Sequence, residues 1–195
     1  MTHSDPTEAW NPISNLDHWE LVSAYCDRWC GRCRHRARCL VAGDGIREAL
    51  IHEEPRPSLE DDPLMRPTNA WRQACLDWLA DRPAEGSEGP ARELDQVLGW
   101  HAILVPNKLY RALLTQHHER RSGPTEGPHP NDAQGSAKVA ALGLYACISI
   151  LTRWCEAHRL DHRAMEILME TSHLLEQLQG AFPDHMSFRR PGFED

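Results

Sequence analysis

Apolar residues recur at spacings of three and four over most of this chain, and this spacing is the period of an amphipathic helix. The first apolar stripe consists of Leu16, Trp19, Val22, Cys26 and Trp29. Asn15 lies just before this stripe and can cap the helix that the stripe predicts. The stripe therefore predicts a helix that carries the first cysteine on its core face.

Four further helices are predicted downstream. A stripe from Trp71 to Leu79 predicts a helix from Thr68 to Arg82. Residues 91–121 form a long apolar pattern that we expect to be kinked, or split in two, at Pro106. Residues 133–159 are the most apolar segment and predict the central helix.

The last predicted helix spans residues 162–180, where Asp161 can act as the N-cap and Gly180 can end the helix in a left-handed conformation. A short segment after Gly45 can also be helical. No segment alternates with the period of a strand. The fold class is therefore all-α, a helical bundle of about five or six helices.

Prolines, glycines and polar residues predict the parts of the chain between and around these helices. We expect two long Pro/Gly-rich loops at residues 53–67 and 122–134. Residues 1–13 resemble a flexible leader, and residues 183–195 form a tail that we expect to be extended. The interpretation is a single helical domain over residues 14–182.

Composition limits the classes of function. The chain has 195 residues and a formal net charge of -8, which disfavours nucleic acid and anionic membranes as partners. The N-terminus lacks the basic and apolar regions of a signal peptide, and we expect no segment that could span a membrane. We therefore predict a cytoplasmic protein, where seven cysteines favour metal ligation over disulfides.

Four of the seven cysteines fall within fourteen residues, at Cys26, Cys30, Cys33 and Cys39. The spacing is C-x3-C-x2-C-x5-C, and four thiolates so close together can coordinate zinc or an iron-sulfur cluster. A straight helix would separate Cys26 from Cys33 by about 10.5 Å, which is too far for one small cluster. We therefore expect the helix to end at Gly31 and a loop to bring Cys39 back as the fourth ligand.

The compact spacing favours a 4Fe-4S cluster over zinc, because structural zinc sites usually use two separated pairs of ligands. Such a cluster with four thiolates carries a charge of roughly -2. Arg28, Arg32 and Arg34, followed by Arg36 and Arg38, can supply compensating charge and N-H donors. The predicted function is electron transfer with a protein redox partner, redox sensing or structural support, and the alternative is a zinc-stapled interaction module.

Part of the cysteine segment resembles two iron-sulfur families. The stretch from Cys26 to Cys33 resembles the three-cysteine motif of radical S-adenosylmethionine enzymes, although Arg32 stands where that family usually has an aromatic residue. The stretch from Cys30 to Leu40 resembles the C-x2-C-x5-C half of WhiB-like iron-sulfur regulators. Both resemblances imply a 4Fe-4S cluster, and neither covers the rest of the chain.

His101 lies in the apolar stripe of the segment 91–121, where it can be a structural residue, a donor to the cluster or part of an enzyme pocket between the long helices. Glu166, Glu170 and His173 have the spacing of a di-iron ligand set but lie opposite the apolar stripe of their helix, which argues against a di-iron site.

The three remaining cysteines lie on apolar stripes, and we expect them in the core: Cys75, Cys147 and Cys155. We expect Lys138 to extend to solvent.

Overall fold

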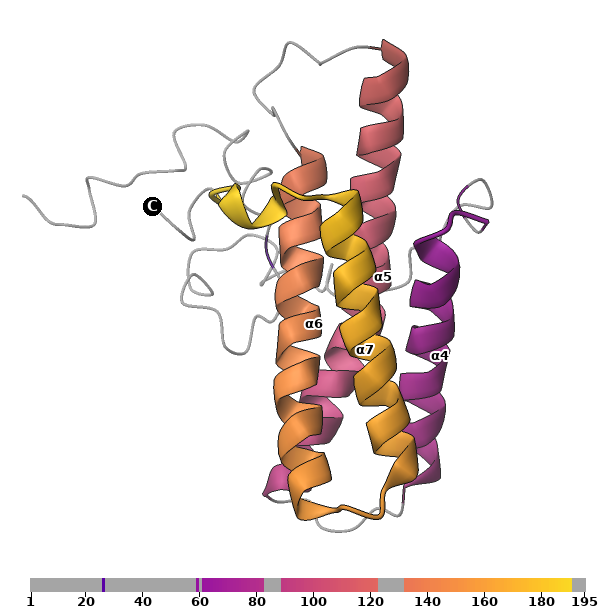
Figure 1. Cartoon of the computed structure of the whole chain (residues 1–195), viewed down its shortest axis with the longest axis vertical. Coiled ribbons are helices and arrows are strands. Elements are labelled where there is room, and N and C mark those ends of the chain that lie inside the picture. The colour runs from indigo at the N-terminus through magenta and orange to yellow at the C-terminus, as the bar shows by residue number, and fades with distance from the viewer. Residues whose placement is uncertain (1–25, 27–58, 60, 83–88, 123–131, 191–195) are drawn as a thin grey trace, which may run out of the picture.

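The computed structural model describes Cys26, Leu59 and residues 61–82, 89–122 and 132–190. All regular secondary structure in these ranges is helical, which confirms the predicted all-α class (Figure 1). The elements are α4 (Met65–Asp81), α5 (Pro90–Ser122), α6 (Asp132–Ala157), α7 (His162–Ala181) and the short 3-10 helix η4 (His185–Ser187). Except for Cys26, the helix predicted from Leu16 and the short segment after Gly45 lie outside the described residues.

The four long helices form an up-down-up-down bundle. Each helix contacts two neighbours, so that α4 and α6 lie on one diagonal and α5 and α7 on the other (Figure 1). The connection between α6 and α7 is a tight turn, and α5 extends beyond its neighbours at the opposite end of the bundle (Figure 1). Helices that are consecutive in sequence therefore run antiparallel to one another (Figure 1).

The start of α4 differs from the prediction. The helix begins at Met65, so the last three residues of the expected loop 53–67 are helical. Pro67 is tolerated there because the N–H that it lacks has no partner in the first turn of a helix. The Asp62 carboxylate accepts hydrogen bonds from the backbone N–H of Leu64 and Met65, at 2.8 and 3.3 Å, and so satisfies free donors at this end.

The predicted start of α7 is confirmed, whereas its predicted end is wrong. Asp161 is the N-cap, as predicted, because its carboxylate accepts a hydrogen bond from the backbone N–H of Ala164 at 2.9 Å. Gly180 does not end the helix, which continues to Ala181 and stops at Phe182, whose N–H still donates to the Leu178 carbonyl. The buried Phe182 ring anchors this end, so a left-handed glycine is not needed.

Helix α5 is a single helix that includes Pro106, so the alternative in which this proline splits the segment is wrong. Proline removes one backbone donor and crowds the preceding turn, which usually bends or breaks an isolated helix. In α5 the neighbouring residues Val105 and Leu109 are fully buried in the bundle. Packing along both adjacent helices therefore holds the segment helical across the missing hydrogen bond.

The core runs the length of the bundle and is formed by apolar residues from all four long helices. A single buried hydrogen bond joins α4 to α7: the Trp71 Nε1–H donates to the Thr171 hydroxyl at 2.8 Å, and that hydroxyl donates to the Ile167 carbonyl at 2.6 Å. Burying an indole N–H is costly without a partner. This bond therefore fixes how α4 sits against α7.

Helix α6 is long and apolar enough to cross a membrane by length and composition, although we expected no such segment. In the fold, 67% of its most apolar window is buried against other parts of the chain. A central helix surrounded by its neighbours is apolar on most sides for the same reason as a membrane span. The hydropathy of α6 is therefore accounted for by its place in the bundle.

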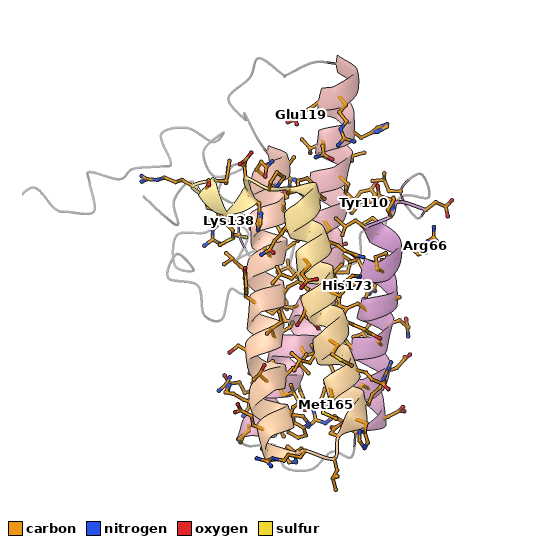
Figure 2. The ribbon with its side chains drawn as sticks, viewed as in Figure 1. Arg66, Tyr110, Glu119, Lys138, Met165 and His173 are labelled. Carbon is orange, nitrogen blue, oxygen red and sulfur yellow. The ribbon has the colours of Figure 1, made fainter. Side chains whose placement is uncertain are left out.

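The segment after α7 is not simply extended, because it contains η4 and packs on α6 (Figure 1). The carbonyls of Met186 and Phe188 accept hydrogen bonds from the Lys138 ammonium group at 3.2 and 2.7 Å. Lys138 is 6% exposed, so the expectation that it reaches solvent is wrong. Figure 2 shows Lys138 beside this C-terminal segment.

Candidate functional site

The four-cysteine segment is described only at Cys26. Its side chain is half-buried. The other predicted ligands, Cys30, Cys33 and Cys39, lie outside the described residues, as do Arg28, Arg32 and Arg34. The predicted metal site therefore stays a prediction.

Elsewhere in the described ranges, no group of three or more histidine, cysteine and carboxylate side chains could hold a metal ion. The residues with di-iron spacing, Glu166, Glu170 and His173, are all exposed on α7, as the sequence predicted. Arg163 pairs with Glu166 at 2.8 Å, and Gln177 hydrogen-bonds the His173 ring at 2.9 Å. These side chains form surface contacts along one helix.

The cysteines of the bundle have environments that disfavour metal binding. Cys75 and Cys147 are fully buried, which confirms that they belong to the core, while Cys155 is half-buried. Burial raises the pKa of each of these three thiols above its ordinary value, and the Glu170 carboxylate raises that of Cys75 further. Cysteine binds metals as the thiolate, so the apolar surroundings of the buried Cys75 and Cys147 disfavour them as ligands.

His101 lies inside the bundle, as its position in the apolar stripe predicted, and is 5% exposed. A Cβ atom at Gly143 of α6 would lie 2.8 Å from the His101 Nδ1 and 3.0 Å from the Val105 Cγ2. The absence of a side chain at Gly143 thus allows α6 to approach the imidazole ring closely. This contact explains why glycine occupies the middle of a helix, where it is otherwise unfavourable.

A groove of about 530 Å³ runs between α4 and α7. Its floor includes Trp71 and Leu174, and its walls carry Asp77, Glu170 and Arg163. Neither helix was predicted to face a groove, because each stripe has the width expected of a closely packed helix. The sequence offers no signal for it, since the groove depends on the spacing between two helices.

A second groove, of about 560 Å³, lies near the start of α5 and is lined by Leu94, Ile150, Trp154 and His158. The His158 ring stacks on Trp154 with ring centroids 3.9 Å apart, and the Arg82 guanidinium lies 4.3 Å from the centroid of the Trp154 ring. Arg82 also pairs with Asp95 at 2.6 Å. His101 lines neither of the two grooves.

Two buried lysines form the feature that sequence reasoning missed. The chain has only two lysines, Lys108 on α5 and Lys138 on α6, and they are 4% and 6% exposed. A buried ammonium group is costly unless carbonyls or anions surround it. The available signal was the scarcity of lysine, since two of the 21 lysine and arginine residues are lysines.

A scan against protein-family models, a search of curated proteins and a search of solved structures found no match to this chain.

Proposed function

We propose that this protein binds one 4Fe-4S cluster through Cys26, Cys30, Cys33 and Cys39 and uses it for electron transfer or redox sensing. The observation that carries the proposal is the spacing of these four cysteines within fourteen residues. The spacing favours iron-sulfur over zinc, because zinc staples usually draw on two separated pairs of cysteines.

The distribution of charge supports the same proposal. Five arginines lie between Cys26 and Cys39, and they can neutralise the anionic cluster and donate hydrogen bonds to its sulfur atoms. With four protein thiolates the cluster has no open iron for a substrate. A role in moving or sensing electrons therefore fits better than catalysis at the metal.

The environments of the three cysteines in the bundle make them poorer candidates for metal ligands than the four clustered cysteines. The thiols of Cys75 and Cys147 are buried among apolar side chains, and this burial raises their pKa values. Cys155 is half-buried on α6, and the Asp161 carboxylate also raises the pKa of its thiol. Among the residues that the structure describes, the remaining cysteine is Cys26, which belongs to the clustered motif.

Anaerobic purification tests the proposal directly. We expect a brown protein that contains about four iron and four sulfide per chain, as a single 4Fe-4S cluster requires. A colourless protein with stoichiometric zinc would overturn the proposal in favour of a zinc-stapled module. Visible absorption before and after reduction with dithionite would then report whether the cluster changes its oxidation state.

A pair of serine variants tests the ligand set. Cys39→Ser should lower the iron and sulfide content strongly, because it removes one of four thiolates. Cys155→Ser is the matched control, since it removes a half-buried thiol outside the motif and should leave the cluster content unchanged. Equal iron content in both variants would show that Cys39 is not a ligand.

A further inference from the structure

The outer side of the α5–α6 pair forms a face that lies outside the bundle core and is buried except at the half-buried Trp100. We call it the α5–α6 face and define it by Trp100, Leu104, Lys108, Gly135 and Val139. The close approach of Gly143 to His101 fixes the antiparallel register of the two helices. In that register Leu104 is level with Ala140 and Lys108 with Ser136, so the face is continuous across both helices.

The burial of this face requires a cover. Leu104 is 7% exposed and Val139 is 1% exposed, yet neither belongs to the apolar cluster that fills the bundle. The C-terminal segment covers one edge, where the carbonyls of Met186 and Phe188 accept from Lys138. Leu104 and Lys108 lie on the other helix of the pair, and their burial calls for a further segment.

The chemistry of the face defines what fits it. Its centre is apolar, and Gly135 allows a neighbour to approach the α6 backbone closely. Its edges carry both lysines of the chain, and Arg111 follows Lys108 on the same side of α5. A helix with a narrow apolar stripe and acidic residues beside that stripe is complementary to such a face.

We propose that residues 16–29 of this chain dock on the α5–α6 face as an amphipathic helix. The segment has the apolar stripe defined above, and an α-helix would place Glu20 and Asp27 together on one flank of the stripe. Cys26 belongs to this segment and is half-buried. The carboxylates of the flank are complementary in charge to the two lysines at the edges of the face.

This docking goes beyond the proposed function and does not depend on which metal the cysteines bind. It places Cys26 against the outer side of α5 and α6. The cysteine site then lies on the flank of the bundle, and the basic side chains of the face contribute to its electrostatic environment.

Acylation of the two lysines with an amine-reactive ester, read by mass spectrometry of the full-length protein, tests the docking. Both lysines should react at least about tenfold more slowly than in the urea-unfolded chain, because they are buried. Val22→Asp places a charge in the stripe and should raise the rate at Lys108 about fivefold or more. Ala24→Asp places the same charge on the opposite side of the helix and should leave the rate within about twofold of wild type.

Circular dichroism would show whether the four-helix bundle of each variant stays folded. If Val22→Asp unfolds the bundle, Trp19→Ala provides a milder change in the same stripe. A wild-type acylation rate in a folded stripe variant would overturn the proposal. Rates that fall as protein concentration rises would also overturn it, because a second copy of the chain would then cover the face.

The same samples separate this inference from the proposed function. Iron and sulfide content report the cluster, and lysine reactivity reports the docked helix. Four iron per chain with no effect of Val22→Asp would leave the cluster proposal standing and overturn the docking. Stripe-dependent protection in a protein without iron would support the docking and overturn the cluster.

Discussion

The α5–α6 pair and the α4–α7 pair belong to the same bundle but pack differently. Between α5 and α6, Gly143 leaves so little room that a Cβ atom there would lie 2.8 Å from the His101 ring. Between α4 and α7, a groove of about 530 Å³ reaches down to Trp71 and Leu174. Close approach thus depends on a residue without a side chain, whereas the wider pair is held by the buried bond from Trp71 to Thr171.

The comparison teaches that the two interfaces resist different changes. A tight interface is sensitive to added volume, because neighbouring atoms cannot move apart without disturbing the core. An open interface tolerates added volume on its walls but depends on the few polar contacts that join it. Four sets of measurements can break or sharpen this distinction.

The largest effect is expected at the single buried bond of the open pair. Thr171→Val removes the hydroxyl but keeps the shape, and it leaves the Trp71 N–H buried without its acceptor. We expect a loss of about 2 kcal/mol in the free energy of unfolding, measured by urea titration. Ser172→Ala removes a hydroxyl that bonds only within α7 and should cost about 0.5 kcal/mol or less. Equal losses would mean that the cross-helix bond contributes little.

In the tight pair, Gly143→Ala should destabilise the protein by about 1.5 kcal/mol, since overpacking outweighs the gain in helix propensity. Gly180→Ala on α7 adds the same methyl group where nothing lies within 4 Å, and it should stabilise the protein by about 0.5 kcal/mol. The opposite signs can be read from thermal unfolding. A stabilising Gly143→Ala would show that the His101 ring can move aside at little cost.

The third measurement asks whether the open pair admits water to the core. Cys75 is fully buried on α4 beside the groove residue Ala74, and burial raises the pKa of its thiol well above the ordinary value of 9.0. Below pH 9.0 the thiol is protonated in both the folded and the unfolded protein, and its contribution to stability is fully present. Above it the unfolded thiol ionises first, so stability falls as pH rises, by roughly 1 kcal/mol per pH unit for this group.

Urea unfolding of wild type and Cys75→Ala across the alkaline range checks this pH dependence. The variant should lose stability less steeply above about pH 9 than wild type does. Cys155→Ala is the control, because its thiol is only half-buried and its removal should change the slope less. Identical slopes for wild type and Cys75→Ala would indicate that water reaches Cys75 from the groove.

The smallest effect is expected on the wall of the groove. Ala70→Leu adds volume at an exposed position of α4 and should change the free energy of unfolding by no more than about 0.5 kcal/mol. Ala141→Leu adds the same volume at a fully buried position of α6 and should cost about 2 kcal/mol. A large loss for Ala70→Leu would mean that the groove closes in solution.

The helices and several of their ends could be predicted from the sequence, because they depend on neighbours along the chain. The period of three and four located α4, α5, α6 and α7, and Asp161 identified the start of α7. The same local reasoning ended α7 one residue early at Gly180 and allowed a break at Pro106. Both errors arise where buried contacts from other helices, at Phe182 and around Val105, outweigh local preference.

The sequence by itself determined the helical class, the four clustered cysteines and the core positions of Cys75 and Cys147. Each of these follows from the spacing of residues along the chain, because residues at a spacing of three or four lie on the same face of a helix. Only the tertiary structure decided the burial of Lys108 and Lys138, the contact of Gly143 with His101 and the groove between α4 and α7. The physical reason is that these features depend on which distant segments pack together, and residue spacing within one helix does not specify its neighbour.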